Sequence, residues 1–168
     1  MTISDQARTA VIKAIEENPG AVIDFIAKDH GVPPADVLTL LPQGQVKTVG
    51  GDKFIEVMDE MATWGEVTMI VTNDDVIFEC KADLSPGSEG RGMFNLHGKP
   101  MSGHLRLGNC ASISFVSRKL FTSDAHSVQF YNHNSTCMFK VYLGRDADGK
   151  LKDHQVAKYQ AYREKICS

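Results

Sequence analysis

Apolar residues within positions 1–63 recur every three or four residues, which is the spacing of amphipathic helices. Helix-ending signals divide this part of the chain, because Asn18-Pro19-Gly20 stops the first helix and Gly31 offers the left-handed residue that ends a second. A short helix follows Pro33-Pro34, and a further amphipathic segment covers about 52–63. The pattern therefore predicts a helical layer over residues 1–63.

From Trp64 onward the pattern changes to short segments rich in β-branched and aromatic residues, separated by Asn, Asp, Gly and Pro. Strands are predicted at about 66–72, 75–82, 92–97, 102–108, 111–117, 126–131 and 136–143. No helix-length segment separates consecutive strands, and parallel neighbours need long crossovers, so the sheet is predicted to be antiparallel. The last amphipathic stretch, 150–166, is expected to close over this sheet as a helix.

The 168 residues show no internal repeat, linker or low-complexity segment. We therefore expect one α+β domain over 1–168, with a helical layer at 1–63, an antiparallel sheet at 64–145 and a C-terminal helix at 150–166. A sheet of several strands without a barrel-closing signal leaves edges that must be short, covered or paired. A two-fold symmetric homodimer is the expected way of pairing them.

The composition is that of a soluble globular protein, with 42% hydrophobic and 23% charged residues. Its 18 basic and 21 acidic side chains give a formal net charge of -3, which provides no strong general attraction to nucleic acid or to an anionic membrane. No leader begins the sequence and no run approaches the roughly 20 apolar residues of a membrane helix, so a cytoplasmic location is expected. The four cysteines form no metal-binding pattern and are expected to be buried free thiols.

The stretch 27–37 has the small residue, turn glycine and later β-branched residue of a helix-turn-helix. Its second helix, at about 34–41, would carry only Asp36 and Thr39 as polar side chains, with no Arg or Lys for phosphates or guanine. Packing is therefore the preferred interpretation, and DNA binding ranks third among the functions considered. Gly90-Arg91-Gly92 lacks the third glycine of a dinucleotide fingerprint, and neither a phosphate loop nor a nucleophile elbow occurs.

Four side chains of the kinds that bind heme iron fall within the twelve positions 93–104: Met93, His97, Met101 and His104. Gly103 precedes His104 and removes the side chain that would collide with a flat macrocycle approaching the sheet. Basic residues nearby would pair with the heme propionates, namely Arg91, Lys99 and Arg106. A surface or hydrogen-bonded histidine is the ordinary alternative for each imidazole.

The chain resembles a known family over about 22–162, and the motifs that carry the resemblance follow one another in the family's order. These motifs are Trp64-Gly65-Glu66-Val67-Thr68, Val76-Ile77-Phe78-Glu79, Gly92-Met93-Phe94-Asn95-Leu96, Met101-Ser102-Gly103-His104 and Phe139-Lys140-Val141-Tyr142-Leu143-Gly144-Arg145-Asp146. The family is that of the cytosolic heme-utilisation carriers of Gram-negative bacteria called HutX or ChuX. The resemblance implies a saddle-like antiparallel sheet flanked by helices, in a dimer that looks like one molecule of the longer, internally duplicated heme-trafficking proteins.

The resemblance also implies a function, which is to accept heme inside the cytoplasm, keep it soluble and pass it to a heme-degrading enzyme. No covalent bond of heme has to change, so a non-enzymatic carrier is the preferred interpretation. A heme-degrading enzyme of related fold is the second, and bleaching of heme in the presence of a reductant would distinguish it.

The family's Gly-His pair falls on Gly103-His104, which makes His104 the first choice for the axial ligand of the iron. Two positions depart from relatives: Met93 stands where many have a tyrosine, and Thr72 stands where some have a histidine. Three outcomes stay open. His104 binds alone with water opposite, His97 or Met93 supplies the second ligand, or the affinity for heme is weakened or lost.

Overall fold

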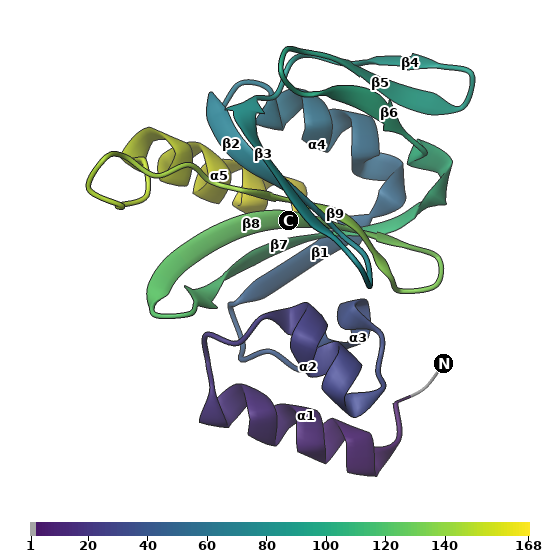
Figure 1. The fold of residues 1–168 in the computed structure, drawn as a ribbon, viewed down its shortest axis with the longest axis vertical. Coiled ribbons are helices and arrows are strands. Elements are labelled where there is room, and N and C mark those ends of the chain that lie inside the picture. Colours follow the sequence, from purple (N-terminus) through teal and green to yellow (C-terminus); the bar gives the residue numbers. More distant parts are fainter. Residues whose placement is uncertain (1–2) are drawn as a thin grey trace.

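The computed structural model describes residues 3–168, which form five α-helices, nine strands and two 3₁₀ turns (Figure 1). The first two positions of the predicted domain lie outside the described residues. The α+β class predicted from the sequence is confirmed. In chain order the elements are α1 (Asp5–Glu17), α2 (Ile23–His30), α3 (Pro34–Leu38), β1 (Val46–Gly50), η1 (Gly51–Lys53), α4 (Phe54–Met61), β2 (Glu66–Thr72), β3 (Ile77–Asp83), β4 (Ser88–Gly90), β5 (Met93–His97), β6 (Ser102–Leu105), η2 (Leu107–Asn109), β7 (Cys110–Leu120), β8 (Ser123–Asn132), β9 (Cys137–Tyr142) and α5 (Asp153–Ile166).

The strand pairings are antiparallel, as the sequence predicts, but they build two sheets rather than one. The large sheet has six strands in the order β1-β7-β8-β9-β2-β3. The small sheet joins β4, β5 and β6. In Figure 1 the small sheet lies at the top of the molecule, and α1, α2 and α3 lie at the bottom.

Two of the observed strands, β1 and β4, are not predicted from the sequence. β1 lies within the predicted helical layer and pairs instead with residues 112–116 of β7. β4 consists of Ser88, Glu89 and Gly90, and it pairs with β5. Neither segment has the alternating apolar pattern of an independent strand, so each depends on the hydrogen-bond ladder that its partner offers.

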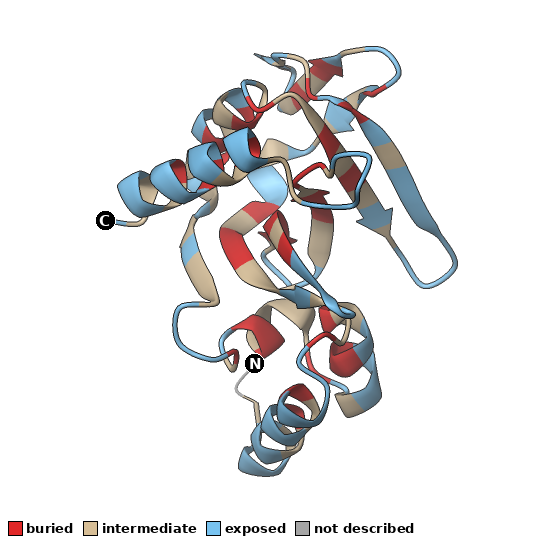
Figure 2. Ribbon diagram, turned by 90° about the vertical axis from the view of Figure 1, so that its left-hand side faces the viewer, coloured by how far each residue is buried: buried red, intermediate tan, exposed pale blue. Residues whose placement is uncertain are grey.

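Two clusters of buried side chains hold the layers together, one on each face of the large sheet. Phe115 of β7 faces the cluster formed with α4, α5 and the small sheet. Its neighbour Val116 faces the cluster formed with α1, α2 and α3. Successive residues of a strand point to opposite faces, so this one strand contributes to both clusters. Figure 2 shows buried residues where the layers meet.

The helix-turn-helix alternative covers α2 and α3. Gly31 ends α2 with the left-handed φ of 63° that the sequence predicts. α3 then has only five residues, and its Val37 and Leu38 are buried in the cluster that joins the helices to the sheet. These apolar side chains are used for packing, which agrees with the preferred interpretation of this stretch. None of the helices within residues 3–168 is long and apolar enough to span a membrane.

The four cysteines are free, as the sequence predicts. Cys110 is buried, whereas Cys80, Cys137 and Cys167 are partly exposed, so the expectation of burial holds only in part. Burial raises the pKa of Cys110 to about 11 and that of Cys137 to about 12. Both thiols therefore stay protonated and weakly nucleophilic near neutral pH.

The small sheet packs over α4 with one face only. Phe94 and Leu96 of β5 are buried in this contact, and the ring of Phe94 stands edge-on to that of Phe54, with 5.7 Å between the ring centroids. The residues that alternate with them along β5 point the other way. The outer face of the small sheet is thereby left open, and it carries the candidate site.

Candidate functional site

Three of the predicted ligands share the outer face of the small sheet. In the pairing of β5 with β6, Asn95 lies opposite His104, and Met93 and His97 stand two positions to either side of Asn95. Because side chains alternate along a strand, Met93, Asn95 and His97 point to the same face as His104. His97 and His104 are exposed, and Met93 is half-buried.

This shared face limits how iron can be held. Diagonal neighbours across an antiparallel pair lie about 7–8 Å apart, so Met93 and His97 flank His104 on the same side of any flat ligand that covers the sheet. The two axial ligands of a heme approach the iron from opposite sides of the macrocycle. A heme lying on this face would therefore receive one axial ligand from it.

His104 is held by a chain of hydrogen bonds. Its Nδ1 lies 2.7 Å from Oδ1 of Asn95, and Nδ2 of Asn95 donates to the backbone oxygen of Ser88 at 3.0 Å. Metal-ligating histidines are usually oriented in this way, with one ring nitrogen bonded to the protein and the other bonded to the metal. Nε2 of His104 is the nitrogen that this arrangement reserves for a ligand.

His97 uses its ring differently. Its Nε2 lies 2.7 Å from the hydroxyl oxygen of Ser88, so the less hindered ring nitrogen is already engaged with the protein. Of the two exposed histidines on this face, His104 is therefore the better iron ligand.

The three basic residues predicted to meet the propionates stand at two ends of the small sheet, and all are exposed. Arg91 lies in the turn between β4 and β5, where it and Gly92 have positive φ angles of 55° and 74°. Arg106 directly follows β6 and reaches the same end. Lys99 lies in the turn between β5 and β6, at the opposite end. Two cations thus gather at one end and one at the other.

Two further residues from the sequence analysis lie away from this face. Met101 is 5% exposed and belongs to the core beneath the small sheet, so it is a packing residue and not a ligand. Thr72 ends β2 in the large sheet and lines a groove between the β2–β3 turn and α2. Thr72 and His104 therefore belong to different sheets.

Sequence reasoning missed two residues of the site, Ser88 and Asn95. Asn95 lies inside the motif 92–96, between Met93 and His97, and this position was the available signal. Ser88 belongs to the short strand β4, which has no strand-like pattern of its own. Only the pairing of β4 with β5 brings Ser88 next to Asn95.

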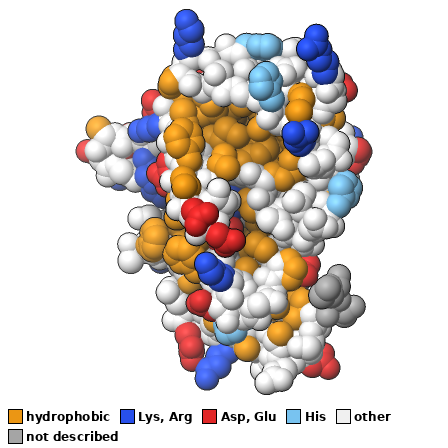
Figure 3. All heavy atoms as spheres, turned by 45° about the vertical axis from the view of Figure 1, so that its right-hand side comes forward, with side chains coloured by type: hydrophobic (Ala, Val, Ile, Leu, Met, Phe, Trp, Pro, Cys, Tyr) orange, Lys and Arg blue, Asp and Glu red, His pale blue; other side chains and the backbone are white. Residues whose placement is uncertain are grey.

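Apolar side chains are also exposed on the β2–β3 hairpin of the large sheet. Val71 and Phe78 are paired across β2 and β3 and are 41% and 60% exposed. Both side chains point to the same face of the large sheet as Met69, which is buried in the core. Figure 3 shows an apolar hollow with histidine and basic side chains along its upper border. An imidazole ligand, cationic ends and nearby apolar surface are the features that hold a porphyrin with propionates.

Comparison with known proteins agrees with the resemblance read from the motifs. The family model described as Haem utilisation ChuX/HutX matches residues 47–162. The intracellular heme transport protein HutX of Vibrio cholerae is 31% identical over 156 residues, which cover 92% of this chain and 81% of that protein.

Solved structures share the fold over nearly the whole chain. A protein from Erwinia carotovora superposes with a TM-score of 0.89 at 36% identity, covering 98% of this chain and 99% of that one. The heme-binding protein ChuX superposes with a TM-score of 0.85 at 31% identity, covering 94% of this chain and 99% of that one. Motifs, sequence match and fold together show that the chain belongs to the ChuX/HutX family of heme-utilisation proteins.

Proposed function

We propose that this protein binds heme in the cytoplasm and carries it, chemically unchanged, to a heme-degrading enzyme. The observation that carries the proposal is the exposed imidazole of His104, whose Nδ1 lies 2.7 Å from Asn95 and whose Nε2 is left for a ligand. Neutral imidazole is a common axial ligand of heme iron. Two relatives support the proposal, since HutX of Vibrio cholerae is an intracellular heme transport protein and ChuX is a heme-binding protein.

In the proposed complex the macrocycle covers the outer face of the small sheet, with His104 as its axial ligand. Met93 and His97 lie beneath the ring, because they share the face of His104 and flank it. Arg91 and Arg106 receive the propionates, since two cations at one end of the sheet match two carboxylates on one edge of heme.

Ligation from one side suits a carrier. Iron bound to His104 alone keeps its second axial position for water or for a ligand of the receiving protein. Heme then passes on by exchange of one protein ligand, and the open face gives the acceptor access to the macrocycle. An open axial position would also admit dioxygen, so transport and degradation are distinguished by an assay for heme breakdown.

A titration of the apoprotein with hemin, followed by the Soret and visible bands, tests the proposed function. We expect His104→Ala to bind hemin at least about tenfold more weakly than the parent, because the iron loses its protein ligand. His133→Ala is the matched control, since His133 is an exposed histidine in the β8–β9 turn. Circular dichroism checks that both variants are folded. Equal affinity of His104→Ala and the parent would refute ligation by His104.

The same complex distinguishes the carrier from the enzyme. With an added reductant and oxygen, a carrier keeps its Soret band over the time of the assay. Bleaching of this band with release of iron or a linear tetrapyrrole would instead establish heme degradation.

We also propose a homodimer in which the second copy covers apolar surface that one chain leaves open. β3 is a seven-residue strand at the edge of the large sheet, and its Ile77 and Phe78 are 56% and 60% exposed. A long apolar edge strand is a site for pairing with another chain. Light scattering of the apoprotein is expected to show a dimer of the 18.5 kDa chain.

Matched substitutions locate the interface. Phe78→Asp is expected to give monomers, because a carboxylate on the edge strand cannot be buried without a partner. Phe121→Asp, at a 71% exposed phenylalanine between β7 and β8, should leave the dimer intact. A parent mass near 18.5 kDa at micromolar concentration would contradict the proposed dimer.

A further inference from the structure

We infer that Asn95 is a positioning residue, which holds the neutral ring of His104 in the tautomer with its proton on Nδ1 and so presents the Nε2 lone pair to a ligand. The tautomer follows from contacts within the protein. Its use for binding heme iron rests on the proposed function.

The backbone of β4 sets the orientation of the Asn95 amide. Nδ2 of Asn95 donates to the carbonyl oxygen of Ser88 at 3.0 Å. A carbonyl oxygen accepts hydrogen bonds and never donates, so turning the amide around would place two oxygens against each other. The amide nitrogen therefore faces Ser88, and the amide oxygen faces β6.

This orientation decides where the proton of His104 lies. Oδ1 of Asn95 can only accept, and it lies 2.7 Å from Nδ1 of His104. A hydrogen bond of this length needs a hydrogen on Nδ1. The neutral ring carries a single proton, so Nε2 keeps its lone pair. Free neutral histidine favours the other tautomer, and the contact with Asn95 reverses that preference.

The strand register keeps these groups in place. Ser88 lies opposite Asn95 in the pairing of β4 with β5, and Asn95 lies opposite His104 in the pairing of β5 with β6. The three residues form one row across the small sheet, in which directly opposed Cβ atoms are about 4.5–5.5 Å apart. The imidazole is thus oriented by the sheet itself.

Ser88 also hydrogen-bonds to His97, the other exposed histidine on this face. The hydroxyl of Ser88 lies 2.7 Å from Nε2 of His97. If the hydroxyl donates, it occupies the lone pair of Nε2, and if it accepts, Nε2 carries the proton. In both cases Nε2 of His97 cannot bind iron while this bond is formed. The side chain of Ser88 therefore hydrogen-bonds to His97, while its backbone carbonyl orients Asn95 and, through Asn95, the ring of His104.

NMR of the apoprotein with ¹⁵N-labelled histidine measures the tautomer directly, at a pH above the ordinary imidazole pKa of about 6.5. We expect the Nδ1–H form of His104 in the parent. Asn95→Leu should shift the ring toward the Nε2–H form. Ser88→Ala is the matched control, because it removes the hydroxyl and keeps the carbonyl, so His104 should stay in the Nδ1–H form.

The parent measurement decides the tautomer without requiring any variant to fold. An Nε2–H form of His104 in the parent would overturn the inference. An unchanged tautomer in folded Asn95→Leu would overturn it as well, since another group would then hold the ring.

Hemin affinity separates this inference from the proposed function. Loss of a partner behind a metal-binding histidine costs about 10–100-fold in affinity, so Asn95→Leu should bind hemin more weakly by that factor while His133→Ala binds like the parent. An altered tautomer with unchanged hemin affinity would overturn the use of the tautomer, while ligation by His104 is decided separately by His104→Ala. An unchanged tautomer with normal hemin binding by the parent would overturn the role of Asn95 and leave the carrier function standing.

Discussion

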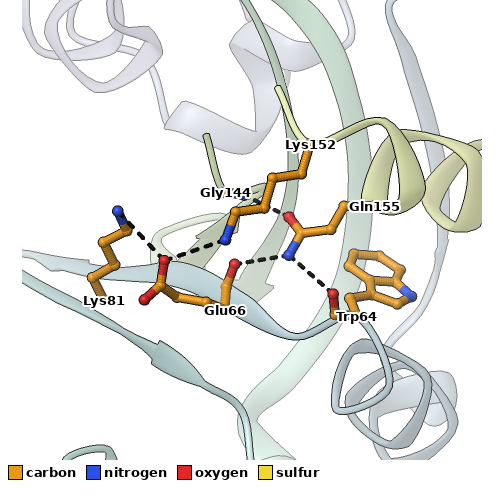
Figure 4. A network of polar contacts seen from close by, with 6 residues as sticks. All are labelled: Trp64, Glu66, Lys81, Gly144, Lys152 and Gln155. Carbon is orange, nitrogen blue, oxygen red and sulfur yellow. Dashed lines mark hydrogen bonds and ion pairs between the residues drawn. The ribbon is translucent and has the colours of Figure 1, made fainter. Parts of the chain in front are cut away.

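The side-chain amide of Gln155 accepts a hydrogen bond from the backbone N–H of Gly144, with 2.6 Å between Gly144 N and Gln155 Oε1 (Figure 4). Its Nε2 donates to the backbone oxygens of Trp64, at 3.0 Å, and Glu66, at 2.8 Å. Gln155 is completely buried, so its bonds satisfy backbone groups that solvent does not reach. One side chain of α5 therefore joins the stretch before β2 to the stretch after β9.

The glycine at position 144 has a packing reason. A Cβ atom added there would lie 2.5 Å from the backbone oxygen of Glu66, which is far inside van der Waals contact. The two stretches that meet at this point carry the most specific sequence motifs of the chain, 64–68 and 139–146. These motifs thus build the junction of β2, β9 and α5, whereas the candidate heme face lies on the small sheet.

Gln155→Leu is expected to lower the free energy of unfolding by about 3 kcal/mol, because it removes three hydrogen bonds that a completely buried side chain makes to backbone groups. Gln160→Leu, at an exposed position of the same helix, should change stability by no more than about 0.5 kcal/mol. Urea unfolding of both variants checks the difference. Equal effects would mean that the amide network contributes little.

An ion pair between Lys140, which is buried, and Asp24, which is partly buried, ties β9 to α2. Burial lowers the pKa of Lys140, but neighbouring Cys137, Asp24 and Tyr142 outweigh burial and raise it, so the ammonium stays charged. Lys140→Met is expected to destabilise the protein by up to about 3 kcal/mol, since it leaves the partly buried carboxylate of Asp24 without its partner. Combined Lys140→Met and Asp24→Leu should cost less than the sum of the single changes in chemical denaturation. Strictly additive costs would contradict coupling of the two charges.

His126 is expected to make the protein less stable below neutral pH. Burial lowers its pKa, more than the charge of Asp124 raises it, and its Nδ1 lies 2.9 Å from Oγ of Ser117. The unfolded chain then binds a proton more readily than the folded one. Stability should fall as the pH falls from the ordinary pKa of about 6.5 toward the lower folded value. His126→Gln should reduce this slope in melting curves recorded across that range, and a parallel slope in both proteins would contradict the prediction.

Substitutions of Met93 test whether heme receives only one axial ligand from this face, because a second ligand would change the midpoint potential of the iron. Because Met93 shares the face of His104, Met93→Leu is expected to leave the heme spectrum and midpoint potential unchanged. Met93→Tyr is likewise expected to leave the potential unchanged, because a tyrosine at this position also shares the face of His104; coordination by its phenolate, a hard anionic ligand, would lower the potential. Redox titration of the three complexes measures the difference. A lower potential in Met93→Leu would identify the thioether as an iron ligand.

Local patterns in the sequence were sufficient for much of the fold. β2 is predicted at 66–72 and observed at Glu66–Thr72, because alternation of its apolar residues places Val67 and Met69 in the core. Gly31 ends α2 as predicted, since its left-handed backbone is a property of the residue itself. The family motifs identified the class of protein, and the Gly103-His104 pair pointed to the histidine that the hydrogen bonds favour.

The sequence by itself determined the α+β class, the antiparallel pairing and the family, because periodicity, turn residues and motifs are local signals. Only the tertiary structure decided that Met101 is a core residue, that Met93 and His97 share one face with His104, and that Asn95 stands opposite His104. These relationships depend on strand register and on which face of the small sheet packs over α4. Contacts between distant segments set the strand register and decide which face of a sheet is buried. A shift of the register by one residue would turn every side chain of a strand to the other face.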